Sequence, residues 1–142
     1  MNLYLAARYS RRLELCDYAA SMEARGHHIT SRWLLGSHQA ENDQLQRGAE
    51  AERFAAEDLD DVRRAHAVIA FTEPPRSNTS RGGRHVEFGY ALGLGIPLVI
   101  VGPRENVFGC LVDQFEGWET ALVHLEAIVP RSLVAAPVSG IE

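Results

Sequence analysis

The sequence is poor in cysteine, has no long apolar run and carries no excess of basic residues, and each shortage argues against a class of protein. Its only two cysteines, Cys16 and Cys110, lie far apart and lack the spacing of metal ligands. The longest apolar run, residues 96–101, is far shorter than the ~20 residues that a membrane-spanning helix needs. The formal net charge of -5 argues against a nucleic-acid polymer as the main partner, because a basic surface drives that interaction.

These shortages, together with an opening segment that has no charged and then apolar leader, predict a cytoplasmic protein of a reducing compartment. A chain of 142 residues fits one domain with one core. No internal repeat or low-complexity linker divides it. We therefore predict a single domain over residues 1–129 and a loosely held C-terminal tail over residues 130–142.

Apolar strand patterns alternate along the chain with amphipathic helix patterns. Strands are predicted at residues 2–7, 28–34, 67–72, 98–101 and 115–118. Helices are predicted from Ser10 as N-cap to Gly26, over residues 46–64, around Glu87 as far as Gly95, and over residues 118–129. The first helix is expected to bury Leu13, Cys16, Ala19 or Ala20, and Met22. This order predicts a doubly wound α/β fold of Rossmann or flavodoxin-like type, with a five-stranded, mostly parallel sheet and helices on both faces.

Polar residues gather where the predicted strands end. Ligands of doubly wound sheets bind outside the carboxyl ends of the strands. Here those ends lead into residues 7–10, 32–34, 72–83 and 102–108, which hold most of the arginine, serine and asparagine residues outside the predicted helices. The topology therefore predicts a polar site at this edge of the sheet.

Glu87 stands where a flexible loop becomes a helix, just before a buried strand. The loop, residues 73–83, is rich in proline, serine and glycine, which favour bends that expose backbone N–H groups. The helix after it ends at Gly95, shortly before Pro97. A carboxylate at such a junction is a candidate nucleophile, whose charge a helix N-terminus would stabilise.

The residues around Glu87 resemble a known enzyme family. The run GRHVEFGYA at residues 83–91, with Gly95-Ile96-Pro97, is similar to the Gly-x-x-x-Glu-x-Gly-x-Ala signature of the nucleoside 2-deoxyribosyltransferases and the related 2'-deoxynucleoside 5'-monophosphate N-glycosidases. Three further places resemble that family: YLAAR at residues 4–8, DLDDV and AVIA at residues 58–62 and 67–70, and PRENVF at residues 103–108. The resemblance covers roughly residues 2–129.

This resemblance implies a retaining displacement at C1' of a deoxyribosyl group. Glu87 would attack C1' and form a covalent glycosyl-enzyme, which water or a second base then resolves. Asp58 matches a family carboxylate that would donate a proton to the leaving base, and the Tyr4 hydroxyl would orient Glu87. Because carboxylates and a good leaving group suffice for this chemistry, neither a metal nor an organic cofactor is expected.

Two departures from the family favour a deoxynucleotide over a free deoxynucleoside: His66 before the third predicted strand, and Arg81 beside Ser80 in the loop. The expected cradle for a 5'-phosphate consists of Arg8, Ser10, Ser80, Arg81, Gly83 and Arg84. Ala6 is also expected to contact the substrate. Trp33 and Phe108 would stack on the base, or else belong to the core or to an interface.

The loop at residues 102–108 resembles one that completes the site of a neighbouring subunit in this family. If Asn106 does so here, the protein is a homodimer or a higher homo-oligomer with a shared active site. The expected substrate is a small deoxynucleotide or deoxynucleoside, and neither a membrane nor a nucleic-acid polymer is an expected partner.

Several interpretations remain open at the level of sequence. Asp58 lies in an acidic helix and also fits a solvated charged face, and Tyr4 fits simple packing in the sheet. His27 and His28 favour a surface role over metal binding, and His85 is expected to be structural. A carboxylate at a loop-to-helix junction also fits a TIR-like NAD glycohydrolase or a non-catalytic nucleotide-binding or sensing module.

Overall fold

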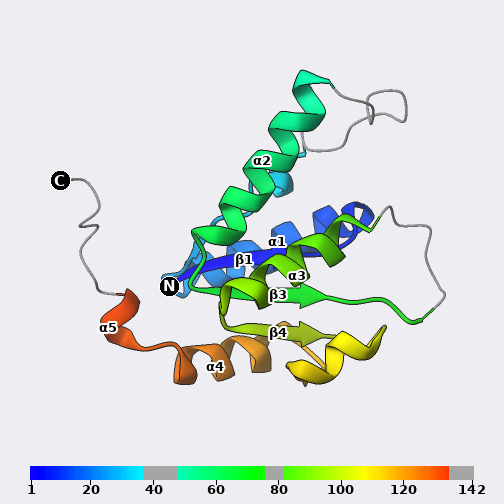
Figure 1. Ribbon diagram of the computed structural model, residues 1–142. Coiled ribbons are helices and arrows are strands. Elements are labelled where there is room, and N and C mark those ends of the chain that lie inside the picture. Colours follow the sequence, from blue (N-terminus) through cyan, green and yellow to red (C-terminus); the bar gives the residue numbers. More distant parts are fainter. Residues whose placement is uncertain (37–47, 76–81, 135–142) are drawn as a thin grey trace.

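The computed structural model describes residues 1–36, 48–75 and 82–134 and contains one sheet of five parallel strands (Figure 1). The strands are β1 (Asn2–Ala6), β2 (His28–Ile29), β3 (Ala67–Phe71), β4 (Leu98–Val101) and β5 (Asp113–Phe115). Their order across the sheet is β2-β1-β3-β4-β5, and every neighbouring pair is parallel. This order is that of the flavodoxin-like doubly wound fold, so the predicted fold class is confirmed.

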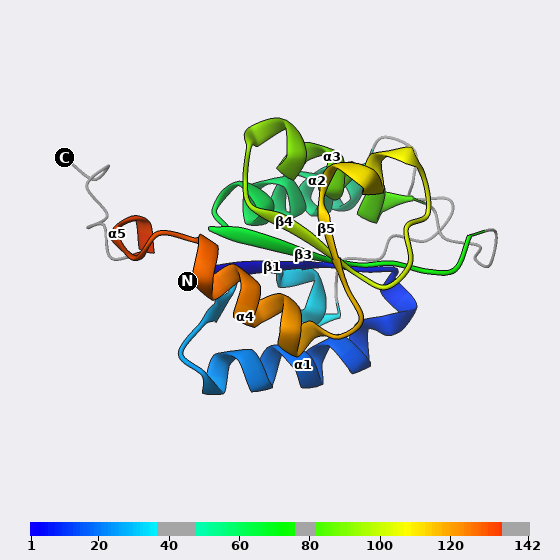
Figure 2. The same cartoon turned by 90° about the horizontal axis from the view of Figure 1, so that it is seen from below.

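Four longer helices cover the two faces of the sheet, two on each face (Figure 2). They are α1 (Arg12–Ala24), α2 (Ala49–Arg63), α3 (Gly83–Leu94) and α4 (Trp118–Ile128). α1 and α4 lie on one face, and α2 and α3 lie side by side on the other. Short helical segments follow β1, β2 and β4, namely η1 (Tyr9–Arg11), η2 (Arg32–Leu35) and η4 (Val107–Leu111), and α5 (Arg131–Val134) follows α4.

The core is centred on β1 and β3. All five residues of β3, the run AVIAF, are buried, as expected for a strand covered on both faces. On β1, Tyr4 and Ala6 share one face because successive side chains of a strand alternate. Tyr4 lies near carboxyl groups of α2 and α3, so this face of β1 is the one that those two helices cover.

The second strand is much shorter than predicted, because side chains replace the backbone ladder beside β1. A strand was expected over residues 28–34, whereas β2 ends at Ile29 and residues 32–35 form η2. The Ser31 hydroxyl accepts a hydrogen bond from the Leu5 N–H (2.7 Å), and the Trp33 indole N–H donates to the Leu5 carbonyl (2.8 Å). These bonds satisfy the backbone N–H and carbonyl groups of Leu5 at the edge of β1. The chain after Ile29 therefore does not have to continue as a strand beside β1.

Two other predictions near the strand ends are wrong in detail. Ser10 does not cap the first helix: it lies within η1, and α1 begins at Arg12 with Arg11 as its N-cap. The expected buried face is only partly right: Ala19 and Met22 are buried, but Leu15 is buried in place of Leu13, which is 71% exposed. The last strand ends at Phe115 rather than beginning there, because Trp118 already opens α4.

No helix within the described residues has the length and apolar character needed to cross a membrane. The prediction of one domain with a loose tail falls partly on residues 135–142, which lie outside the described residues, and it stays a prediction. The cytoplasmic location likewise remains an expectation from the sequence.

Candidate active site

The strand order reverses at β1, which lies between β2 and β3, and in doubly wound folds such a reversal makes the carboxyl ends of β1 and β3 the candidate ligand site. From β1 the chain crosses to β2 on one side, and then returns through α2 to β3 on the other. In doubly wound folds, the loops that leave the sheet at such a point diverge and open a crevice. Three predicted catalytic residues, Tyr4, Asp58 and Glu87, come from the elements around this point.

Glu87 of α3 lies close to Asp58 of α2. Burial, with a further contribution from the negative charge of Asp58, raises the pKa of Glu87 to about 8. Two carboxyl groups at short range resist double ionisation, so the pair tends to keep one proton at neutral pH. Such an arrangement can supply both a carboxylate nucleophile and an acidic proton.

Tyr4 of β1 lies close to the same two carboxyl groups. Burial, then the charges of Glu87 and Asp58, raise the pKa of the Tyr4 hydroxyl well above its usual range, so the hydroxyl keeps its proton. The hydroxyl interacts with the Glu87 carboxyl and partly offsets the rise in the pKa of Glu87, although the two do not meet the geometry of a well-formed hydrogen bond. The tyrosine therefore presents a proton donor to the proposed nucleophile.

The site also depends on Asp61, a residue that sequence reasoning passed over as part of an acidic helix face. Asp61 is fully buried and accepts hydrogen bonds from the Arg32 backbone N–H (2.9 Å), the Arg32 Nε (2.8 Å) and the Arg64 Nη2 (2.6 Å). It therefore ties η2 to α2, and its charge adds to the rise in the pKa of Glu87. The i, i+3 spacing of Asp58 and Asp61 was the available signal, because it places both on one side of a helix.

The start of α3 is set by Gly82, whose φ of 86° is left-handed and favours glycine. Gly83 is the first helical residue, and it is exposed. Glu87 is the fifth, beyond the first turn where a helix N-terminus stabilises negative charge. The expected stabilisation by the helix terminus therefore does not decide the pKa of Glu87, which is raised chiefly by burial.

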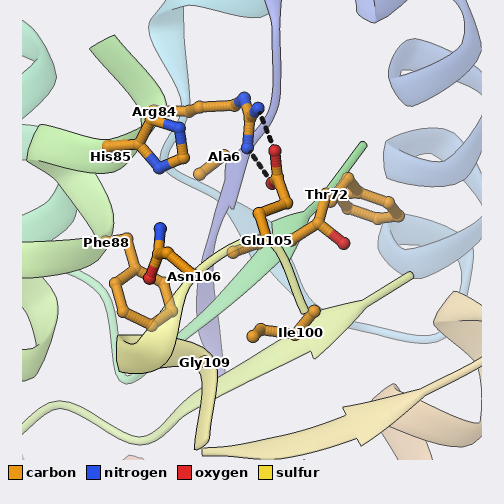
Figure 3. A pocket seen from close by; sticks show the side chains of 11 residues that line it. Ala6, Thr72, Arg84, His85, Phe88, Ile100, Glu105, Asn106 and Gly109 are labelled. Atoms are coloured by element: carbon orange, nitrogen blue, oxygen red, sulfur yellow. Dashed lines mark hydrogen bonds and ion pairs between the residues drawn. The ribbon is translucent and has the colours of Figure 1, made fainter. Parts of the chain in front are cut away.

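A small pocket lies on the same side of the sheet, between α3 and the chain that leaves β4 (Figure 3). Its volume is about 30 Å³, room for a water-sized group rather than a nucleotide. The residues that line it include Ala6, Thr72, His85, Phe88, Ile100 and Asn106. Glu87, which lies near Asp58 of α2, does not line it; the pocket is therefore a neighbour of the carboxyl cluster.

Two arginines of the expected phosphate cradle are already paired with carboxylates. Arg84 is buried and makes a two-pronged ion pair with Glu105, in which Nη2 and Oε2 are 2.6 Å apart (Figure 3). Arg8 lies 3.6 Å from Glu73 through a longer and more exposed contact. Ser10 is exposed on η1, and Ser80 and Arg81 lie outside the described residues.

The residues expected to contact the base occupy different environments. Trp33 is 5% exposed and belongs to the hydrophobic core. Phe108 is 58% exposed on η4. Asn106 precedes η4, where its side-chain oxygen accepts a hydrogen bond from the Phe108 N–H (3.0 Å). The Asn106 amide group lines the small pocket together with His85, which was expected to be structural.

No group of three or more histidine, cysteine, aspartate or glutamate side chains suited to a metal ion occurs in the described part of the chain. His27 instead contacts Glu126 through Nε2 (2.9 Å) and the N-terminal amine through Nδ1 (3.1 Å).

Comparisons with known proteins show a similar fold. Similar solved structures include 2-deoxyribosyltransferases from Bacillus psychrosaccharolyticus (TM-score 0.71, 17% identity, 92% of this chain and 96% of that chain) and Leishmania mexicana (TM-score 0.64, 18% identity, 89% and 97%). A CMP N-glycosidase from Clostridium botulinum is also similar (TM-score 0.54, 17% identity, 89% and 99%). At these identities the likeness concerns the fold, and a search of curated proteins found no match.

The family itself is shown by a sequence model rather than by these structures. The model described as nucleoside 2-deoxyribosyltransferase matches residues 3–122, which include β1, α2, α3 and the loop after β4. The chain therefore belongs to the nucleoside 2-deoxyribosyltransferase family, as the signature around Glu87 suggested.

Proposed function

We propose that the protein cleaves the N-glycosidic bond of a 2'-deoxynucleoside 5'-monophosphate, or of a deoxynucleoside, through a covalent deoxyribosyl-Glu87 intermediate. The observation that carries the proposal is the cluster of Glu87, Asp58 and Tyr4 at the carboxyl end of β1. It combines a carboxyl group with a raised pKa, a second carboxyl group and a buried phenol at the point where such folds bind ligands.

In the first step the Glu87 carboxylate attacks C1' while the C1'–N bond breaks. The bond's electron pair leaves with the base, which takes a proton from Asp58. The Tyr4 hydroxyl steadies the Glu87 carboxylate as it approaches the sugar. In the second step a water, or a nitrogen of a second base, attacks C1' and returns its proton to Asp58, which releases Glu87.

The substrate we favour is the monophosphate. Arg8 is the cradle residue best placed to receive a phosphate, because its contact with Glu73 is long and its side chain is 26% exposed. Arg84 is held by Glu105 and is removed from the proposed phosphate contacts. Gly83, Ser80 and Arg81 stay predicted contacts, and so does Ala6, which lines the small pocket beside the carboxyl cluster.

We also propose that the active site is shared between subunits of a homodimer or higher homo-oligomer. η4 exposes three apolar side chains, Val107 (76%), Phe108 (58%) and Leu111 (66%). Neighbouring exposed apolar side chains of this size mark interaction surfaces. If a second copy binds there, Phe108 and Asn106 of one copy would lie at the edge of the other copy's site.

The proposal is tested with 2'-deoxynucleosides, their 5'-monophosphates and NAD, each with and without a second free base. Chromatography would follow released base and new nucleosides, with Glu87→Ala as control. We expect base release from monophosphates, a loss of about 10³-fold or more in the variant, and a deoxyribosyl adduct on Glu87 in quenched samples by mass spectrometry.

Other outcomes select other functions. Base exchange on free nucleosides would overturn the monophosphate preference and favour a transferase. Release of nicotinamide from NAD would favour the NAD glycohydrolase. Saturable nucleotide binding without turnover, unchanged in Glu87→Ala, would favour a sensing module.

A further inference from the structure

We infer that the ion pair between Arg84 and Glu105 is a brace that fixes the loop carrying Asn106 against α3, so that Glu87 is held for its own site and Asn106 for the site of the neighbouring subunit; this makes both members of the pair positioning residues. The catalytic consequence of this brace depends on the proposed function, whereas its effect on the structure does not.

The brace joins the two chain segments that carry Glu87 and Asn106. Arg84 lies in the first turn of α3, three residues before Glu87, and Glu105 directly precedes Asn106 in the loop after β4. The guanidinium binds both carboxylate oxygens, and the two side chains are only 5% and 9% exposed. A two-pronged pair shielded from water fixes orientation as well as distance.

Glu105 also connects this pair to the ends of β1 and β3. Burial alone would raise the pKa of Glu105, but hydrogen bonds from Arg84 and from the Glu73 backbone N–H outweigh it and hold that pKa below its usual range. The Glu73 carboxylate in turn binds Arg11 (2.9 Å), which follows β1. The segments that leave β1, β3 and β4 are thus linked to α3 through Glu105.

The loop that carries Asn106 is stiffened by its own hydrogen bonds. Arg104 donates from Nε to the Gly109 carbonyl (2.9 Å) and from Nη2 to the Val112 carbonyl (3.2 Å). Asn106 caps η4 through the Phe108 N–H. Because the loop holds its shape, fixing Glu105 also fixes Asn106 against α3.

Stability alone is a poor explanation for this pair. A cation in the first turn of a helix is opposed by the helix dipole, and a buried ion pair is seldom more stabilising than apolar side chains of similar size. A fixed geometry between α3 and the loop is what this arrangement provides and apolar packing would not. Small displacements of a reacting group lower the rate strongly, so this geometry matters for catalysis.

The test uses the full chain and three variants: Glu105→Gln, Arg84→Lys and the double variant Arg84→Met/Glu105→Gln. The double variant leaves no uncompensated buried charge, so it keeps the fold accessible if a single variant unfolds. Glu126→Gln is the matched control. Glu126 lies on α4, away from the site, and pairs with Arg25 (2.6 Å) and His27 (2.9 Å), which follow α1. The measurements are steady-state kinetics with a deoxynucleoside monophosphate and hydrogen–deuterium exchange of residues 82–88 and 103–111.

We expect kcat to fall by about 10- to 100-fold in each single variant because the nucleophile is misplaced, and KM to rise by a smaller factor because Asn106 is the substrate contact next to Glu105. Both segments should exchange faster. The double variant should be no slower in turnover than the singles, because the two residues act as one unit. Arg84→Lys should not retain the kcat of the wild type, because lysine lacks the guanidinium group that binds both carboxylate oxygens. Glu126→Gln should match the wild type in both measurements.

Unchanged exchange in both segments would overturn the brace. Faster exchange with unchanged kcat would leave a purely structural pair and overturn the positioning role. Full activity in Arg84→Lys would show that charge rather than geometry matters, which also contradicts the inference. If the wild type turned over no deoxynucleotide, the proposed function would fail, while the exchange data would still decide whether the brace exists.

Discussion

Glu87 and Asp58 lie on adjacent helices, and burial together with the charge of Asp58 raises the pKa of Glu87 to about 8. An isolated glutamate would have lost its proton well below neutral pH. Here the proximity of the two carboxyl groups retains one. A proton for the leaving base and a carboxylate for C1' therefore arise from the same contact between α2 and α3.

The pH dependence of activity follows from this shift. Attack on C1' needs one carboxyl of the Glu87–Asp58 pair ionised and the other protonated, and the pair loses its one proton above the Glu87 pKa of about 8. We therefore expect kcat/KM to fall about tenfold per pH unit above about pH 8, because no proton is left for the leaving base. Initial rates measured across this range check it; activity that stays constant well above pH 8 would contradict it.

Substitutions at Asp58 and Tyr4 should shift the pKa of Glu87 in opposite directions. Asp58→Asn removes a neighbouring negative charge, so the pKa of Glu87 should fall, and kcat should also be reduced by about 10²-fold or more through loss of the proton donor. Tyr4→Phe removes an interaction that lowers the pKa of Glu87, so that pKa should rise. Shifts of the pKa of Glu87 in the same direction in the pH–rate profiles of the two variants would contradict the cluster.

Glu87→Gln should stabilise the fold at alkaline pH. Below pH 4.5 the carboxyl is protonated in both folded and unfolded chains; between 4.5 and about 8 only the unfolded chain ionises, so the free energy of unfolding of the wild type falls as pH rises. The variant should gain on the order of 1–3 kcal/mol at about pH 9 and much less at acidic pH. Urea unfolding at both pH values measures it, and an equal gain at both would contradict the raised pKa.

Gly102→Ala should destabilise the site edge between β3 and β4. Gly102 has a φ of 119°, and an added Cβ would lie 2.6 Å from the Thr72 hydroxyl oxygen. We expect a loss of about 2 kcal/mol or more in the free energy of unfolding. Gly93→Ala is the control, because Gly93 lies within α3 and its added Cβ would meet no atom within 4 Å outside the neighbouring backbone of that helix. That change should be neutral or stabilising by up to about 1 kcal/mol.

Leu111→Asp should lower the oligomer mass if η4 forms the proposed interface. Leu111 is 66% exposed, and a charge there opposes apolar contact between copies. Val123→Asp is the matched control, since Val123 is 57% exposed on α4, away from η4. Sedimentation of the three proteins measures the result. A monomeric wild type, or equal effects of both substitutions, would refute an interface at η4.

Several features of this protein were determined by short stretches of sequence. The apolar run of β3 lies between a charged helix and a loop rich in turn residues, and a buried strand is the conformation that suits it. Gly95 ends α3 with a φ of 72°, as its position before Pro97 predicted. Glu87 follows the loop within the signature run. Each of these features depends on neighbours in the chain, so periodicity and turn chemistry sufficed.

Other features were decided only by the tertiary structure, because they depend on partners far apart in sequence. Ser31 and Trp33 end β2 by bonding to Leu5, which no local pattern reveals. The sequence predicted that Arg84 binds phosphate, but in the folded protein Arg84 is paired with Glu105. The pKa of Glu87 likewise results from burial and from Asp58 on another helix. The sequence determined which groups reach this edge of the sheet, and packing decided which are neutralised and which remain available, because desolvation and charge pairing exist only once the elements meet.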